Sequence, residues 1–429
     1  MDRKSTLTFY VPKNLDPEIF PEAIRDYAYY FLNLVHWKWI HWKSDSDGFV
    51  RLHYQLITKV IPRNLWPQIK NICLRSGIVE SDHKTIPNKK SLGYRIARTS
   101  QVTHKVICNN PTTVQRIQKF YDSQNRIKAP IHRWLESKLL FLEFDLDQAI
   151  EIIQKLKPRK FKSLHDKKTE ICKYREKRIE YAKTLNDKQH YLIPDSFGRV
   201  HTLITALERE LRCCLSVNGQ ALINIDLANS QPLLLGIFAR QYFRNKKSRY
   251  RFLNKHFTQN KSPSYCLQEI IEMTKRPICD LPKDVLNYVQ LCEWGEFYQS
   301  LMKPGEVKNQ FKIRFYRGVL FGKNEKQRKY PNTLWQRFQL RYPSIAAALI
   351  DLKKRNYRHS AYTLQNYEST MFIKIICGRI MQEKPDTILY TVHDSILTTL
   401  NNVNYIKTVI LDEFSKLGIH PTLRTEICQ

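Results

Sequence analysis

The sequence lacks the cysteine spacings that mark zinc sites and disulfide frameworks. Ten cysteines are scattered over 429 residues without a Cys-x-x-Cys pair, and only Cys213 and Cys214 are adjacent. This distribution favours reduced thiols and excludes a recognisable zinc ribbon or secreted disulfide scaffold. The apolar runs are short as well, since Leu233–Ala239 cannot cross a membrane. Residues Met1–Pro12 carry neither a signal-peptide core nor a transit pattern, so we expect a cytoplasmic protein with no membrane partner.

Acidic residues are scarce relative to basic ones. The chain has 40 Asp and Glu against 71 Lys and Arg, a formal net charge of +31. An excess of this size predicts a polyanionic partner, and nucleic acid fits better than an anionic membrane or a ribosomal context. Hydrophobic residues make up 42% of the chain, which predicts two or three globular domains with a sizeable core.

A glycine-rich phosphate loop is also missing. The twelve glycines include Gly322, which precedes Lys323. The first glycine and the hydroxyl residue of a Gly-x-x-x-x-Gly-Lys-Ser/Thr loop are both absent at this position. This argues against a generic ATPase.

Residues 1–105 mix short helical and strand-like runs. Helices are expected at Phe49–Ile61 and Trp66–Ser76, followed by an extended segment at Ile78–Glu80, a basic turn at Asn88–Ser91 and a returning strand. Two helices and a hairpin with a basic tip are typical of a winged helix, which could dock on a duplex. A structural helical domain with a charged loop explains the same pattern, and both interpretations stay open.

Residues 106–190 are predicted to be helical and strongly basic. Runs of Lys and Arg between Lys155 and Lys183 are only partly balanced by acidic residues. A solvated helix face would normally carry both signs of charge. A surface that tracks phosphates is therefore the better interpretation.

Two carboxylates stand at the ends of strand-like runs. Ala221–Asp226 is a short apolar run that ends in Asp226, and Thr387–Thr398 carries Asp394 where a hairpin turn is expected. Each aspartate alone is explained by a turn or a helix cap. On neighbouring strands of one sheet, however, the pair could hold two Mg²⁺ ions about 3.5–4 Å apart.

A helix with a cationic start follows between these two strands. Four residues recur at every fourth position: Lys308, Lys312, Tyr316 and Leu320. They are followed by Phe321 and place cations at one end of a helix face and aromatic or apolar groups at the other. The cations can neutralise a triphosphate, and an aromatic ring can stack on a base.

These segments, in this order, resemble the palm and fingers of family A DNA polymerases and of the related phage-type single-subunit RNA polymerases. Asp226 matches the first catalytic aspartate, His393-Asp394 the later His-Asp motif, and Lys308–Gly322 the fingers helix. Three weaker matches agree in order: Asp195–Thr202, Phe338–Pro343 and Leu364–Lys374. The resemblance covers Tyr191–Thr399, about half of the chain. The fingers helix is one residue longer than the usual spacing between Lys312 and Phe321.

The resemblance implies an α+β fold with an antiparallel right-hand palm and helical fingers at 191–429, a thumb-like region at 106–190 and a winged-helix-like domain at 1–105. It assigns catalysis to Asp226, Asp394 and Lys312, with both aspartates as metal ligands. The nucleotide-binding residues by the same argument are Lys308, Gln231, Phe321 and Tyr316. The residues implied for the primer and template are Arg199, Arg209, Arg212, Gln365 and His393.

The sugar of the substrate depends on the gate position, five residues after the first aspartate. DNA enzymes of this kind carry a bulky gate residue, whereas RNA enzymes use a small one and a tyrosine on the fingers helix. Here Gln231 is bulky and Phe321 has no hydroxyl, so dNTPs and a DNA primer–template are expected, with an RNA template left open. Ser395 is the contrary indication, because His-Asp-Ser is common in the RNA enzymes. An RNA polymerase, a primase and a DNA-binding initiator with an inactive palm remain alternatives.

A proofreading exonuclease is not expected. Asp16 and Glu18 have Asp-x-Glu spacing, but they lie in a loop broken by proline. Asp145 and Asp147 precede a helix that begins near Gln148, and helix capping accounts for them. The compact layout suggests a plasmid, phage or other mobile element.

Overall fold

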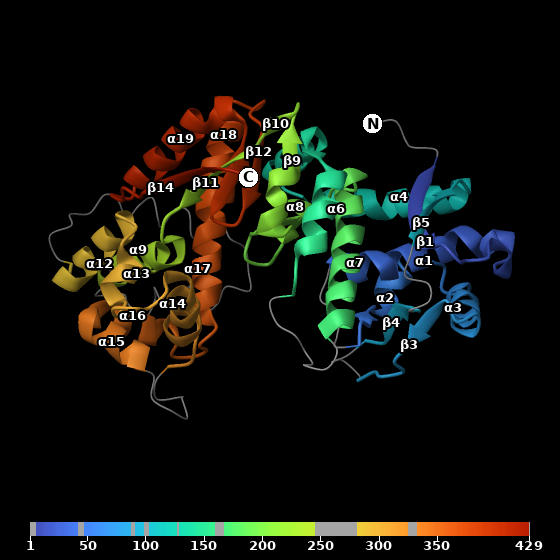
Figure 1. The fold of residues 1–429 in the computed structure, drawn as a ribbon, viewed down its shortest axis with the longest axis horizontal. Helices are drawn as coiled ribbons and strands as arrows, with labels where there is room; N and C mark the ends of the chain where they lie inside the picture. Colours follow the sequence, from blue (N-terminus) through green and yellow to red (C-terminus); the bar gives the residue numbers. More distant parts are fainter. Residues whose placement is uncertain are drawn as a thin grey trace. The chain divides into compact units, whose positions relative to one another are not determined.

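The computed structural model describes eight stretches of the chain: 6–41, 47–86, 91–97, 103–126, 128–158, 167–244, 281–324 and 333–428. The protein is α+β, with several small antiparallel sheets among many helices (Figure 1). Contacts divide it into two compact units, Met1–Lys128 with Ile153–Lys183 and Ala129–Ile152 with Thr184–Gln429. Residues 106–190, predicted as one basic region, are therefore divided between the units. None of the helices in the described stretches is long and apolar enough to cross a membrane.

The first unit contains two small sheets around a long helix. Its helices are η1 (Pro17–Ile19), α1 (Glu22–His41), α2 (Tyr54–Ile57), α3 (Trp66–Arg75), α4 (Pro111–Arg126) and most of α7 (Lys167–Asn186). Its strands are β1 (Leu7–Pro12), β2 (Val50–Arg51), β3 (Val79–Ser81), β4 (Gly93–Ile96) and β5 (Thr103–Cys108). Strand β1 pairs with β5, and the second sheet has the order β2-β4-β3. The core is aromatic, with Phe31 packed edge-on against Trp66 and Tyr94.

The structure corrects one of the predicted N-terminal helices. Trp66–Arg75 is helical, but Phe49–Ile61 is not one helix, because Val50 and Arg51 pair with β4 and only Tyr54–Ile57 is helical. The expected hairpin is present as β3 and β4. Of its basic tip, 88–90 lie outside the described residues.

A buried ion cluster joins α7 to the rest of the first unit. Glu180 Oε2 lies 3.3 Å from His36 Nε2 and accepts a hydrogen bond from Thr103 Oγ1 at 2.8 Å. Lys183 Nζ lies 2.7 Å from the other carboxylate oxygen. Although burial opposes it, the bonds from His36 and Lys183 lower the pKa of Glu180 to about 2. The basic helix is thus attached through Glu180, one of its three acidic residues, while its lysines and arginines are distributed along the helix.

The second unit is built on a four-stranded antiparallel sheet in the order β12-β13-β11-β14. These strands are β11 (Ile223–Leu227), β12 (Leu389–Val392), β13 (Ser395–Thr398) and β14 (Leu423–Ile427). The smaller strands are β6 (Glu143–Phe144), β7 (Leu192–Pro194), β8 (Val200–Thr202), β9 (Leu215–Val217) and β10 (Gln220–Ala221). Alternate residues of β11 are buried, as expected for a strand with one face on the core. Strands β12 and β13 are buried throughout, whereas the edge strand β14 is mostly exposed.

Helices surround this sheet. They are α5 (Pro130–Lys138), η3 (Leu139–Phe141), α6 (Leu146–Lys155), α8 (Leu203–Ala206), η4 (Arg209–Cys214), α9 (Ser230–Arg244), α12 (Lys283–Glu293), α13 (Phe297–Leu301), α14 (Lys308–Phe315), the π-helical η7 (Tyr316–Leu320), α15 (Thr333–Arg341), α16 (Pro343–Leu352), α17 (His359–Ser369), the π-helical η9 (Thr370–Ile376), α18 (Cys377–Glu383), η10 (Leu400–Asn402) and α19 (Val403–Ser415). Asp145 caps α6 as predicted, because its Oδ1 accepts from Gln148 N at 2.9 Å.

An aromatic cluster fixes the helix that carries the predicted cations. The ring of Phe315, on α14, lies 5.2 Å from that of Phe297 and 5.6 Å from that of Phe338. Tyr288 and Tyr342 extend the cluster to α12 and to the start of α16. All five side chains are buried, so one apolar core joins the helices α12 to α16 and holds α14 in place.

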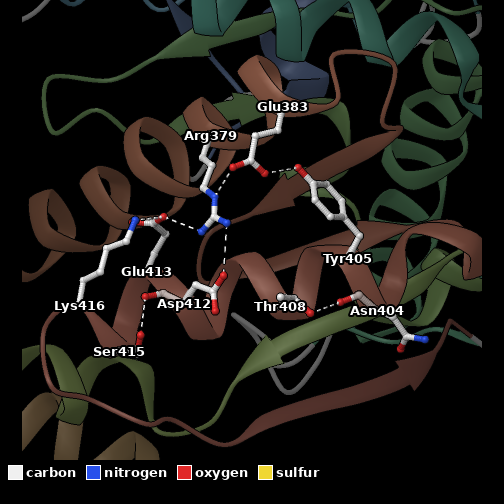
Figure 2. A network of polar contacts seen from close by, with 9 residues as sticks. All are labelled: Arg379, Glu383, Asn404, Tyr405, Thr408, Asp412, Glu413, Ser415 and Lys416. Carbon is white, nitrogen blue, oxygen red and sulfur yellow. Dashed lines mark hydrogen bonds and ion pairs between the residues drawn. The ribbon is translucent and has the colours of Figure 1, made fainter.

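An ion network joins α18 to α19. Figure 2 shows the guanidinium of Arg379 between Glu383 on its own helix and Asp412 and Glu413 on α19. Its shortest contacts are 2.6 Å to Glu383 and 2.9 Å to Glu413. Tyr405 donates to the second oxygen of Glu383 at 3.0 Å (Figure 2). This network holds together two helices of the unit that contains the sheet.

Candidate active site

The two predicted aspartates lie close together at one edge of the sheet, Asp226 on β11 and Asp394 in the turn that leads into the neighbouring strand β13. Asp226 is near the end of β11 and is paired in register with Ser395, the first residue of β13. Asp394 precedes it in the two-residue turn between β12 and β13. The backbone oxygen of Asp394 accepts from Leu227 N at 3.3 Å. The expected adjacency of the two strand ends is confirmed, although the residues are far apart in the sequence.

Two left-handed residues shape the turns around this pair. His393 has φ = 57° in the β12–β13 turn, and Asn229 has φ = 53° between β11 and α9. Residues other than glycine adopt this conformation seldom, although asparagine and histidine do so more often than most. Non-glycine residues held there concentrate at functional sites. The second turn starts α9 immediately after β11 and places Gln231 in its first turn.

The pKa of Asp226 reflects two carboxylates that share one partly buried site. Burial raises the pKa of Asp226 to about 6, and the charge of Asp394 acts in the same direction. The positive charges of Lys312 and Arg424 oppose this rise. A cation bound between the carboxylates would relieve their repulsion and replace the water that each has lost.

The donor chemistry fits Mg²⁺. Both side chains offer hard carboxylate oxygens, which this ion prefers. Among the residues that the structure describes, no group of three or more His, Cys, Asp or Glu side chains could hold a metal. Mg²⁺ commonly takes one or two carboxylates and completes its shell with water and substrate phosphates. His393 is a poor ligand for such an ion, because Mg²⁺ prefers oxygen.

Three cations accompany the carboxylates. Lys308 and Lys312 lie one turn apart on α14, on the same face of the helix, while Phe311 and Phe315 occupy the buried face. Burial lowers the pKa of Lys308, and the nearby charges of Arg424 and Lys312 add to this effect. The structure therefore places Lys312 near Asp226, and Lys308 near Lys312 and Arg424.

Arg424 is the cation that the sequence analysis missed. It lies on β14 directly opposite Asp226 in the strand register. Its guanidinium also approaches the turn after α12, where a Cβ on Gly295 would lie 3.7 Å from Nη2. Arg424 follows the last segment of the family resemblance, so only the short strand-like run Leu423–Ile427 could have indicated it.

The extra residue in the predicted fingers helix is taken up by a π-helix. Residues Tyr316–Leu320 continue α14 as one π turn, in which Phe321 N donates to Tyr316 O at 2.8 Å. A π turn is the usual way in which a helix accommodates one inserted residue, and such turns are frequent at functional sites. Phe321 and Tyr316 are neighbours, with ring centroids 5.6 Å apart.

Tyr316 brings a hydroxyl to the site. Burial raises its pKa, and the negative charges of Asp394, Glu368 and Asp226 act in the same direction. Tyr298 donates to the Tyr316 hydroxyl at 3.2 Å and opposes the rise. Phe321, which led us to expect a deoxynucleotide substrate, has no hydroxyl, but the neighbouring Tyr316 supplies one.

Glu368 is a second residue that the motifs did not identify. It lies on α17, and its carboxylate accepts hydrogen bonds from Gln231 and, at 2.8 Å, from Arg199. Burial raises the pKa of Glu368 to about 7, with Arg199 opposing and Asp394 adding to the rise. Arg199, predicted to contact the primer or template, is thus engaged by a protein carboxylate. A lone acid in the Leu364–Lys374 helix was the available signal.

The other residues predicted to bind the primer or template occupy several places. Burial lowers the pKa of Arg212, and the charges of Cys428 and Asp226 oppose the change. Arg209 is exposed and pairs with Glu426 of β14 at 2.7 Å. Gln365 lies on α17, three residues before Glu368.

Comparison with known proteins does not place the chain in a family. No protein-family model matches it, and no curated protein matches it significantly. The assignment of function therefore depends on the motifs and on the geometry of the site.

Proposed function

We propose that this protein is a template-directed DNA polymerase that extends a primer 3′-hydroxyl with dNTPs and has no proofreading activity. The observation that carries the proposal is the juxtaposition of Asp226 on β11 and Asp394 in the turn before β13, with Lys312 and Arg424 close enough to shift the pKa of Asp226. Two adjacent carboxylates beside a group of cations are what nucleotidyl transfer requires.

The acidic residues of the site would bind metal ions, and the basic residues would bind phosphates. Two Mg²⁺ ions held by Asp226 and Asp394 would activate the attacking hydroxyl and stabilise the leaving oxygen. Lys308, Lys312 and Arg424 would bind the triphosphate and stabilise the negative charge of the departing pyrophosphate. Phe321 would pack on the incoming nucleotide.

The first unit supports binding to a duplex. In sequence order, its elements from α1 onward are α1, β2, α2, α3, β3 and β4. Strand β2 pairs with β4 and so adds a third strand to the β3–β4 hairpin. This order is typical of a winged helix. With a net charge of +31, the chain is suited to phosphate backbones.

One observation favours an RNA polymerase or primase as the second candidate. The hydroxyl of Tyr316 is near Asp394 and Asp226, where it could donate to a ribose hydroxyl. The bulky Gln231, buried beside Glu368, argues for the deoxyribose instead. We give Gln231 more weight than the Tyr316 hydroxyl, because a bulky gate residue excludes the ribose 2′-hydroxyl sterically.

Primer extension tests the proposal. A labelled primer–template is incubated with Mg²⁺ and either dNTPs or NTPs, using the wild type, Asp394→Ala and the control Asp351→Asn, a carboxylate of α16. We expect dNTP extension by the wild type and the control, and none by Asp394→Ala. Binding to the primer–template without extension by any form would favour a DNA-binding initiator with an inactive palm.

A further inference from the structure

A buried polar pair lies near Asp394. Glu368 is 1% exposed and Gln231 is 7% exposed. Gln231 Nε2 and Arg199 Nη2 both donate to the same oxygen, Glu368 Oε2. One carboxylate oxygen therefore fixes the amide of the gate residue and is itself balanced by a guanidinium.

Each of these two side chains also has one buried oxygen that accepts no hydrogen bond in the described part of the chain. Within the described stretches, Glu368 Oε1 and Gln231 Oε1 accept no hydrogen bond, and Ser230 Oγ also makes none. A buried polar atom that makes no hydrogen bond destabilises the folded protein, because it has lost its contacts with water. Such atoms are rare in folded proteins, so a cluster of them calls for a functional explanation.

The turn formed by Asp195–Arg199 packs against the backbone next to Glu368. Ser369 Oγ donates to Phe197 O at 2.5 Å, and a Cβ on Gly198 would lie 2.9 Å from that hydroxyl oxygen. Asp195 Oδ1 accepts from the backbone N of Phe197 and of Arg199 and closes this turn. The turn therefore packs against the end of α17 and delivers Arg199 to Glu368.

We propose that Glu368 is a positioning residue for sugar selection, which holds Gln231 where it excludes the 2′-hydroxyl of a ribonucleotide. The inference rests on the proposed function and adds a residue from a distant helix to it. A free glutamine side chain has several rotamers, and holding it in one of them costs conformational entropy. The bond to Glu368 removes that freedom, so the gate keeps one position. Without Glu368, Gln231 can turn aside and admit a ribose.

The test compares kcat/KM for a matched dNTP and NTP in four variants. We expect Glu368→Ala and Gln231→Ala each to lower the dNTP:NTP ratio about 10- to 100-fold, the range that one contact in a binding pocket supplies. The double variant should lower it no further than either single one. Glu368→Gln keeps an oxygen that can accept from Gln231 and Arg199, so it should retain most of the ratio.

Two further variants keep the test decisive. Glu368→Asp retains the buried charge but withdraws it from Gln231, so it should lower the ratio even if Glu368→Ala does not fold. Glu413→Ala removes another buried carboxylate, paired with Arg379 and Lys416, and should lower stability without changing the ratio.

The contrary outcomes separate the two proposals. Unchanged ratios in Glu368→Ala and Glu368→Asp, with dNTP extension intact, overturn the role of Glu368 and leave the polymerase proposal standing. Additive effects in the double variant overturn the action through Gln231. Loss of all incorporation in folded Glu368→Gln would make Glu368 a direct participant in catalysis instead. A wild type that extends with neither sugar overturns both proposals.

Discussion

At Asp226, the ionisation of one carboxyl group connects stability with metal binding. Its pKa is raised by burial and by Asp394 to about 6, from an ordinary value of 3.8. A carboxyl group whose pKa is higher in the folded protein favours folding while it is protonated. That contribution is complete below about pH 4 and is lost as the pH rises through 6.

The variant Asp226→Asn should therefore be more stable than the wild type at pH 8, in the absence of metal, by about 1–3 kcal/mol. Near pH 4 the difference should disappear. Denaturant unfolding at both pH values measures it. Mg²⁺ should raise the Tm of the wild type much more than that of the variant, because binding to the folded state alone stabilises it. A wild type that is as stable as Asp226→Asn at pH 8, or more stable, would contradict this account of the site.

Arg424 makes a separate prediction, because it lies opposite Asp226 and near Lys308. Arg424→Ala should raise KM for the nucleotide about 5-fold, equivalent to about 1 kcal/mol. It should also move the acid limb of the kcat profile to higher pH, because one of the charges that lower the pKa of Asp226 is removed. Steady-state kinetics across pH measure both effects.

Two controls accompany that measurement. Arg424→Lys keeps the charge and should keep most of the affinity. Lys416→Ala removes an exposed cation of another element and should leave KM unchanged. Equal effects from Arg424→Ala and Lys416→Ala would show that only the overall charge matters.

At the scale of elements, the attachment of α18 to α19 depends on Arg379. Its guanidinium contacts Glu383, Asp412 and Glu413, and Glu413 is buried (Figure 2). Arg379→Ala should lower the free energy of unfolding by about 1–3 kcal/mol, because it leaves a buried carboxylate with fewer donors. Thr408→Ala removes only an exposed hydroxyl bond to a backbone oxygen and should change stability by less than about 0.5 kcal/mol. Denaturant unfolding of both variants measures these changes. Similar losses of unfolding free energy in the two variants would contradict the role of the network.

The sequence predicts the elements that carry strong local patterns. The apolar run that ends at Asp226 and the β-rich run around Asp394 are strands of one sheet, as their composition indicated. Phe49–Ile61 failed as a helix because β4 supplies a partner for Val50 and Arg51, and strand pairing overrides local helical preference.

The residues that escaped prediction depend on distant contacts. Arg424 acquires its place only because β14 pairs with β11, a register that no local pattern contains. Glu368 meets Gln231 across two helices, α17 and α9, that are far apart in the chain. The π turn at Tyr316–Leu320 explains the irregular spacing of the fingers-like helix, which the sequence showed but could not interpret.

At the scale of the molecule, the domain boundaries expected from the charge distribution differ from the boundaries of the two folded units. The compositional boundaries at 105 and 190 follow the basic segment, whereas residues 153–183 return to the first unit and attach there through Glu180. The biological occasion suggested by the compact layout, a plasmid, phage or other mobile element, stays a hypothesis.

The net charge of +31 predicts strong salt dependence of DNA binding. For about six to ten phosphate contacts, affinity for a duplex should fall about 10³- to 10⁵-fold between 50 and 200 mM salt. Fluorescence anisotropy with a labelled duplex measures the slope. Affinity that is independent of salt would show that phosphate contacts do not dominate the interaction.

The most direct test of the central claim is single-nucleotide incorporation on four primer–templates that differ only in the templating base. With Mg²⁺ present, each template should direct incorporation of its complementary dNTP, and Asp226→Asn should abolish incorporation on all four. Addition of the same nucleotide whatever the template, or activity that survives in Asp226→Asn, would contradict a template-directed polymerase centred on Asp226 and Asp394.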